Sequence, residues 1–240
     1  MLDRPGNSGA ADRIALMERY LARFGAESIG LLLADREFIG VEWFNWLTKN
    51  DIPFAIRMRG VQRATTRDNR MGTLARLLAA PGGRRRATVT LDRMARDGTP
   101  GPALAVRALR PRDRSREAVI VATNRPGIDA LALYRQRWDI ERVFADAKTR
   151  GLNLEDTRLT CPRKLDLLMA LVAIALAWAS ATAAALLGHR RLARKSHGYP
   201  AKSVFRIGFE YLRHLLRTDP FETLTPWKDL NNHPPEGRAV

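Results

Sequence analysis

The first sixty residues show an apolar pattern that predicts alternating helices and strands. Apolar side chains recur at helical spacing over residues 14–24, and Gly25 is placed to end that helix. The apolar run at residues 29–34 predicts a strand buried on both faces, residues 41–47 a short helix, and residues 52–58 a second strand. This order is typical of an α/β sheet with parallel neighbouring strands.

Residues 57–116 have a different character. They hold 16 arginines, four aspartates and no lysine, which concentrates a net charge of +12 in a quarter of the chain. Turn-forming clusters of glycine and proline separate possible strands at residues 88–91, 104–109 and 118–123. The pattern predicts a small β-rich insertion with a basic surface, although a solvated arginine-rich loop would have the same composition.

The rest of the chain reads as helical. One helix is expected from about residue 129 to 148, with Gly151 placed to end it, and an amphipathic helix near residues 204–216. Residues 167–187 carry no charge, and their length makes them a candidate membrane span. Because this segment is rich in alanine and is flanked by basic residues at both ends, we favour a buried core helix.

Composition narrows the class of protein. The 240 residues include 41 Lys+Arg against 25 Asp+Glu, a net charge of +16 with a pI near 11.2, which favours a polyanionic partner. Charge alone does not separate DNA from RNA or an anionic membrane. A single cysteine, Cys161, excludes an internal disulfide framework and a four-cysteine zinc site. The N-terminus lacks the pattern of a signal peptide, so a cytoplasmic protein is expected.

Four residues in the predicted helix at 129–148 form one stripe. Tyr134, Arg137, Glu141 and Lys148 stand at offsets 0, 3, 7 and 14, which on an α-helix fall within about 60° of each other. A glutamate held among cations stays ionised, so it could ligate a divalent metal while the cations hold phosphates. An ordinary exposed face with charge pairs is the alternative.

A second acidic candidate is Asp35, which ends the predicted strand at residues 29–34. Ligands of open α/β sheets bind at the carboxyl ends of the strands, so this position suits a functional carboxylate. A helix cap is the alternative role.

These residues resemble a known family. Tyr134-x2-Arg137-x3-Glu141-x6-Lys148 matches the Y-R-E-K signature of bacterial DDE transposases of the insertion sequence four type. LLLADREF at residues 31–38 is similar to the family's segment around its second catalytic aspartate, and the strand containing Phe54 to Arg57 resembles its next strand. The resemblance spans roughly residues 6–216.

The resemblance implies a fold and a division of the chain. The expected fold is α/β, a partial RNase H-like core with an inserted basic β-rich subdomain and C-terminal helices. Residues 1–60 would form part of the core and 61–125 the insertion. Residues 126–218 would carry the glutamate-bearing helix and the C-terminal helices, and 219–240 a tail.

The resemblance also implies a chemistry, which is cutting and joining of DNA with Mg²⁺ or Mn²⁺. Asp35 and Glu141 would be the second and third catalytic carboxylates and the metal ligands, and Tyr134, Arg137 and Lys148 would contact DNA phosphates. The partners would be double-stranded DNA, as transposon ends and target, and a second copy in a homodimer. No membrane is implied, and the protein would lie in the cytoplasm at the nucleoid.

The family's first catalytic aspartate has no match. Asp3 and Asp12 precede Asp35, but the family places further strands and a helix between its first two aspartates, and this interval is too short for them. We therefore expect an N-terminally truncated transposase that is inactive or impaired. A non-catalytic DNA-binding or inhibitory protein derived from a transposase is the alternative, and a membrane protein anchored by residues 167–187 is a third. Arg36, Glu37 and the histidines receive no role.

Overall fold

The computed structural model describes the chain in several stretches. They are residues 8–79, 86–109, 117–145, 148, 152, 156–188, 192, 196 and 201–225. The chain divides into two compact units, residues 2–138 and 139–240, and each is described by itself.

The first unit begins with the predicted helix and strand pair. Helix α1 (Ala10–Phe24) ends at Gly25, whose φ of 75° lies in the left-handed region that glycine adopts without strain. Strand β1 (Leu32–Ala34), helix α2 (Val41–Lys49) and strand β2 (Phe54–Met58) follow. The two strands pair in parallel with Leu33 opposite Ala55, as the alternating order predicted.

The basic stretch contributes the remaining strands to the same sheet. These elements are β3 (Arg63–Thr66), β4 (Met71–Thr73), helix α3 (Leu74–Leu77), β5 (Arg86–Leu91), β6 (Leu104–Leu109) and β7 (Val119–Thr123). The seven strands run in the order β1-β2-β7-β6-β5-β3-β4, and every pair after the first is antiparallel. The predicted strands therefore exist, and they form one sheet with β1 and β2.

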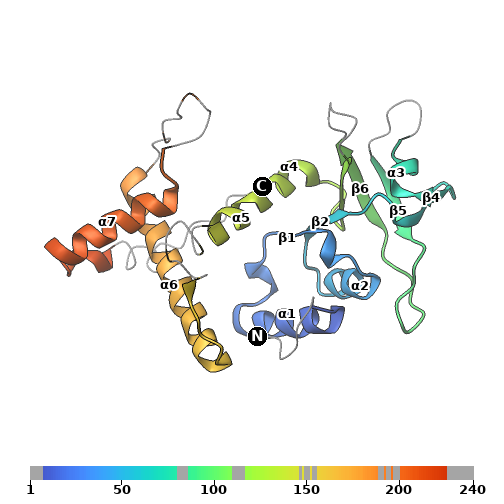
Figure 1. Ribbon diagram of the computed structural model, residues 1–240. Coiled ribbons are helices and arrows are strands. Elements are labelled where there is room, and N and C mark those ends of the chain that lie inside the picture. The colour runs from blue at the N-terminus through green and yellow to red at the C-terminus, as the bar shows by residue number, and fades with distance from the viewer. Residues whose placement is uncertain are drawn as a thin grey trace. The chain divides into compact units, whose positions relative to one another are not determined.

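The sheet has two different faces. Alternate side chains of the strands bury the larger core against α1 and α2, which lie below the strands in Figure 1 and include the fully buried Phe44 and Leu47. The opposite face is covered over β2, β7 and β6 by the short helix α4 (Ala130–Tyr134), where Ala55 and Val121 are buried. Further along this second face the side chains are polar.

The predicted helix at residues 129–148 is not one regular helix. A 3-10 turn at Arg135–Arg137 separates α4 from α5 (Trp138–Ala145). Because a 3-10 turn advances by three residues per turn, it stacks positions i and i+3, whereas an α-helix offsets them. The turn therefore interrupts the predicted α-helix but keeps Tyr134 and Arg137 on one side of it, and the continuation of the stripe to Glu141 and Lys148 stays a prediction.

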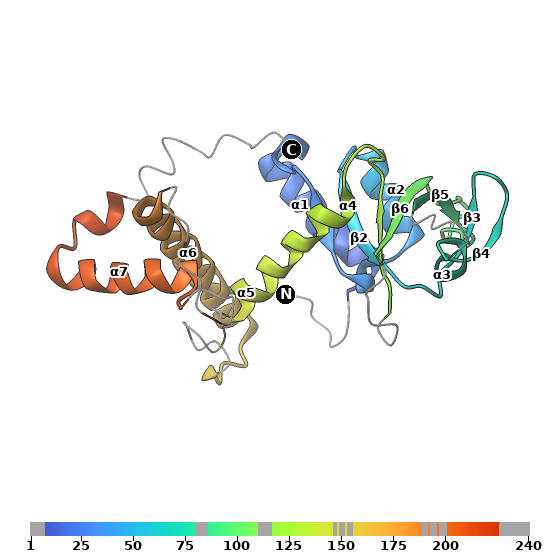
Figure 2. The ribbon, with the colours of Figure 1, turned by 90° about the horizontal axis from the view of Figure 1, so that it is seen from above.

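The second unit contains a helix pair. Helices α6 (Pro162–Leu187) and α7 (Val204–Thr218) cross with Gly208 against the backbone of Ala179, as the turned view in Figure 2 helps to follow. The Trp178 indole donates a hydrogen bond of 2.9 Å to the carbonyl of Thr223, which ties a following 3-10 turn (Glu222–Leu224) to α6. Only glycine permits so close an approach of two helix backbones.

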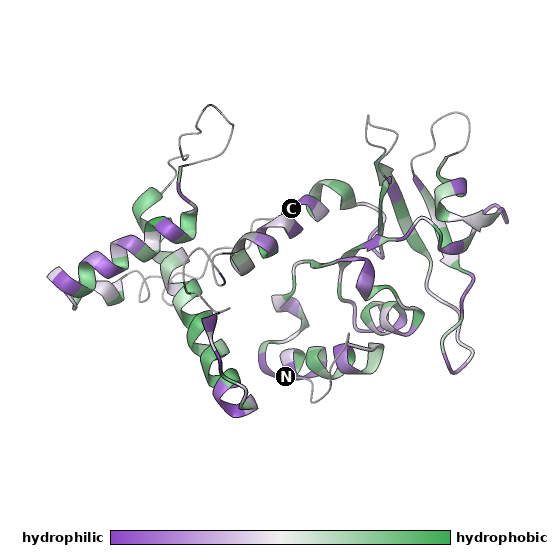
Figure 3. Cartoon of the chain, viewed as in Figure 1, coloured by the Kyte–Doolittle hydropathy of each residue, from purple (hydrophilic) through white to green (hydrophobic). Residues whose placement is uncertain are grey.

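Helix α6 is apolar over most of its surface, as Figure 3 shows. By length and composition it is the one helix of the described residues that could cross a membrane, and 28% of its most apolar window is buried. Most of that window is exposed in the described residues, so the helix is not buried as predicted. Its length and composition alone do not distinguish a core helix from a membrane span.

Candidate functional site

Asp35 lies where β1 ends and the chain turns away from the sheet. It caps a 3-10 turn (Arg36–Phe38), and its Oδ1 accepts a hydrogen bond of 2.7 Å from the backbone N–H of Arg36. Asp35 therefore has the capping role that the sequence offered as an alternative. Since Ala34 is opposite Ile56, the parallel register brings Asp35 alongside Arg57 at the end of the strand pair.

Tyr134 reaches Asp35 from the last residue of α4. Its hydroxyl donates a hydrogen bond of 3.4 Å to Asp35 Oδ1 across a separation of 99 residues. The ring is buried against Ala55, Val121 and Ala130, with 8% of the residue exposed. This packing between α4 and the second face of the sheet fixes the phenol beside the carboxylate.

The electrostatics keep this phenol protonated. Burial raises the pKa of Tyr134 above its ordinary value, and the carboxylate of Asp35 raises it further. The nearby guanidinium groups of Arg137 and Arg57 oppose that shift. At neutral pH the hydroxyl is therefore a hydrogen-bond donor.

Arg137 follows from the 3-10 turn. Position i+3 in such a turn lies over position i, and the Arg137 guanidinium carbon stands 5.7 Å from the centroid of the Tyr134 ring. Arg137 is half-buried, as is Arg57 on β2. Two arginines thus flank the phenol that contacts Asp35, and the cluster joins one carboxylate to two cations.

Glu141 and Lys148 belong to the other unit. Glu141 is in the first turn of α5, and both residues are exposed. Exposure leaves a carboxylate and an ammonium accessible to a metal ion or a phosphate. The expectation that Glu141 shares a metal with Asp35 concerns two separately described units, and it stays a prediction.

The carboxylate of Asp35 is a suitable ligand for a divalent cation. Hard cations such as Mg²⁺ prefer carboxylate oxygens. The hydrogen bonds from Arg36 and Tyr134 both fall on Oδ1, so in the described part of the chain Oδ2 is the oxygen open to a cation. Among the described residues, no group of three or more His, Cys, Asp or Glu stands close enough to hold a metal. Asp35 therefore fits as one ligand of a site that needs others.

The two residues that follow Asp35 make contacts outside the cluster around Tyr134. Arg36 pairs with Glu117 at 3.7 Å, and both side chains are about half exposed. The backbone carbonyl of Glu37 accepts a hydrogen bond of 2.8 Å from Arg13. These contacts anchor the turn, and they give neither Arg36 nor Glu37 a part in the cluster around Tyr134.

Sequence reasoning missed two members of this region. Arg57 was read only as part of a strand, although its alternation with the buried Ile56 and Met58 places it on the face that Tyr134 covers. Arg107 on β6 donates to Asp129 at 3.1 Å, and Asp129 caps α4 by accepting from the backbone N–H of Ala132. The strand alternation could have indicated Arg57, but the Arg107–Asp129 contact depends on the pairing of distant strands.

A comparison with protein families matches most of the chain. A family model described as "Transposase DDE domain" matches residues 3–178. The matched interval includes Asp35, Tyr134, Arg137, Glu141 and Lys148, and it ends inside α6. No curated protein matches the chain.

Proposed function

This chain belongs to the transposase DDE domain family, and from that premise we propose that it is the catalytic region of a transposase of the insertion sequence four type. In this proposal Asp35 and Glu141 hold Mg²⁺ or Mn²⁺, and Tyr134, Arg137 and Lys148 contact the phosphates of double-stranded DNA. The reaction is phosphodiester cleavage followed by strand transfer. The sheet of the first unit is the partial RNase H-like core together with its β-rich insertion.

One contact carries the proposal. The tyrosine of the Y-R-E-K signature donates to the aspartate of the strand-end motif, although each motif was identified separately from the sequence. If the four signature residues formed an ordinary solvated helix face, nothing would bring Tyr134 into contact with Asp35. The basic charge of the unit supports a DNA partner, because phosphate neutralisation releases counterions and drives binding.

The chain's own residues have distinct parts in this mechanism. Divalent ions, when bound, supply Lewis-acid activation of the attacking and leaving oxygens of the phosphodiester. The carboxylates of Asp35 and Glu141 would hold those ions. The protonated Tyr134 hydroxyl orients the Asp35 carboxylate, and Arg137 and Lys148 neutralise the phosphate that is brought against it.

Metal binding tests the site without requiring turnover. We expect Mn²⁺, followed by electron paramagnetic resonance, to bind the DNA-loaded wild-type chain and to be lost in Asp35→Asn. Asp51→Asn is the matched control, because Asp51 is an exposed aspartate in a left-handed conformation that asparagine also adopts. Equal Mn²⁺ binding by wild type and Asp35→Asn would refute the assignment of Asp35.

Cleavage is a separate question for this chain. A catalytic site of this family needs three carboxylates, and only two are assigned here, so we expect no nicking of supercoiled plasmid above background with Mg²⁺ or Mn²⁺. Robust nicking that is lost in Glu141→Ala would contradict that expectation. It would show that another carboxylate completes the site.

A second function is favoured by one observation. The net charge of +12 over residues 57–116 would hold DNA whether or not the chain cuts it. Such a protein would bind or inhibit as a transposase-derived DNA-binding module. Binding that weakens steeply with salt, together with absent Mn²⁺ binding, would favour this second function over the first.

The setting follows from the same proposal. We infer a protein that acts at the nucleoid in the cytoplasm, pairs with a second copy to bridge two DNA ends, and needs no membrane. The family match supports α6 as part of the folded domain, since the matched interval runs into that helix. Recovery of the protein in a carbonate-resistant membrane fraction would contradict this setting.

A further inference from the structure

The second face of the sheet carries a row of arginines that the strand register aligns. Arg57 on β2 is opposite Val121 on β7, Val121 is opposite Arg107 on β6, and Arg107 is opposite Arg86 on β5. Directly paired residues of a sheet point to the same face. The row therefore runs from beside Asp35, at the end of β1, to β5. Helix α4 covers its first part over β2, β7 and β6, where Val121 is fully buried, and the row is exposed beyond α4 at Arg86.

Two of these arginines form an unfavourable pair. Arg86 and Arg107 are directly opposed on neighbouring strands, and like charges in that position destabilise a sheet. Asp129 neutralises Arg107 through a contact of 3.1 Å. Arg86 is exposed at the start of β5 and adds a second positive charge to the same place. A sequence that breaks a local rule in this way usually does so at a functional surface.

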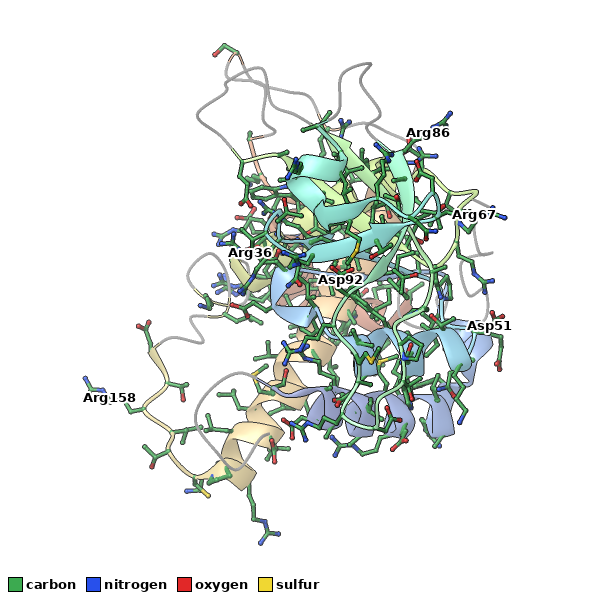
Figure 4. All side chains as sticks on the ribbon, turned by 90° about the vertical axis from the view of Figure 1, so that its right-hand side faces the viewer. Arg36, Asp51, Arg67, Arg86, Asp92 and Arg158 are labelled. Atoms are coloured by element: carbon green, nitrogen blue, oxygen red, sulfur yellow. The ribbon has the colours of Figure 1, made fainter. Side chains whose placement is uncertain are left out.

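The surface beyond Arg86 is polar and hollowed. A hollow of about 430 Å³ lies over β3 and β5, and its lining includes the hydroxyl-bearing Thr65, Thr88 and Thr90. Arg67 borders this hollow and also a smaller neighbouring one that Arg86 lines. In Figure 4 the side chains of Arg67 and Arg86 extend outward at the same edge of the view.

We propose that the part of this row beyond α4, from Arg107 at the edge of the helix to the exposed Arg86, forms with the threonine-lined hollow a tract that binds the sugar–phosphate backbone of double-stranded DNA, leading away from Asp35. The inference rests on the proposed function, since that function brings DNA to Asp35. From Arg57 on β2 to Arg86 on β5 the row crosses three strand spacings of about 4.8 Å, so it is roughly 14 Å long, a length that spans a few phosphates of a duplex. A phosphate between Arg86 and Arg107 would turn their repulsion into attraction.

The tract has the character of a positioning surface. Guanidinium and hydroxyl groups are the common partners of DNA phosphates, and such contacts fix the register of a protein on DNA without reading bases. The strands are rigid elements, so the row would hold the duplex at a set path from the carboxylate. Binding along it is expected to be independent of base sequence.

The test compares two arginines of the β-rich segment by fluorescence anisotropy with duplex DNA over a range of salt. Arg86→Gln removes a charge from the row. Arg96→Gln is the matched control, because the Arg96 side chain is 95% exposed and lies beside Glu42 of α2, toward the other face. One lost phosphate contact lowers the slope of log affinity against log salt by about 0.9, which corresponds to roughly an eightfold loss of affinity at 0.1 M salt.

The outcomes separate the tract from the proposed function. We expect Arg86→Gln to lose affinity and slope as stated, to retain or raise the melting temperature, and Arg96→Gln to match wild type. Equal losses in both variants, or an unchanged slope in Arg86→Gln while wild type binds DNA, would overturn the tract and leave the proposed function standing. A wild-type chain that binds no duplex at low salt would instead overturn the proposed function.

Discussion

The Tyr134 hydroxyl lies 3.4 Å from Oδ1 of Asp35, and it is the contact that joins α4 to the end of β1. The phenol is neutral and donates there, and burial raises its pKa further above neutral pH. Arg57 and Arg137 lie near enough to act on the charge of the phenol, and the Arg137 guanidinium carbon is 5.7 Å from its ring centroid. These contacts surround the Asp35 carboxylate with a neutral phenol and two cations.

The first prediction concerns Tyr134 at alkaline pH. Its pKa in the folded chain is raised above the ordinary value of a tyrosine, mainly by burial, so the unfolded chain ionises first. The neutral phenol therefore contributes stability that is complete below about pH 10 and is lost as the pH rises through the folded pKa. Urea unfolding over this range should show a steeper alkaline loss in wild type than in Tyr134→Phe. Tyr211→Phe, at an exposed position, should behave as wild type does.

The second prediction concerns the junction of β2 and β7. Asn124 donates to the carbonyl of Ile52 at 2.9 Å and accepts from the backbone N–H of Phe54 at 3.1 Å. Asn124→Asp removes the donor and sets a carboxylate against a carbonyl oxygen, so we expect a loss of about 2–3 kcal/mol in the free energy of unfolding. Asn45→Asp, which loses one exposed hydrogen bond to Pro100, should cost under about 1 kcal/mol. Similar losses in the two variants would argue against Asn124 as the side chain that links the end of β7 to the start of β2.

The third prediction concerns the crossing of α6 and α7. A methyl group added at Gly208 would collide with the carbonyl oxygen of Ala179, which belongs to the backbone and cannot swing away. We expect Gly208→Ala to destabilise the second unit by about 1–3 kcal/mol, measured by thermal unfolding. Gly127→Ala has open space around the added carbon and is the control. An unchanged melting temperature in Gly208→Ala would mean that the helices do not cross there.

The fourth prediction concerns the larger core. Phe44 on α2 stacks on Phe54 of β2 with ring centroids 5.3 Å apart, and both residues are fully buried. Phe44→Ala should cost about 3–5 kcal/mol in the free energy of unfolding because it leaves a cavity. Phe221→Ala, at a residue that is 89% exposed, should change it by under about 0.5 kcal/mol. Calorimetry of both variants would distinguish a buried α2 from a loosely packed one.

The strands show where prediction from sequence succeeded and failed. Strand β6 was predicted at its observed bounds, because its short, mostly apolar run is bounded by turn-forming residues. Strands β3 and β4 were missed, since RATT and MGT are short and mostly polar. They become strands through their pairing with each other and with β5, and no local pattern carries that information.

The sequence by itself determined the alternation of helices and strands, the position of Asp35 at a strand end, the spacing of Tyr134, Arg137, Glu141 and Lys148, and the concentration of charge in the middle of the chain. These are local properties, set by neighbours within a few turns or strand residues. Only the tertiary structure decided that Tyr134 meets Asp35 and that Arg86 opposes Arg107. Both contacts join residues distant in the chain, and they depend on strand register and on the packing of α4 against the sheet, which many weak interactions set together.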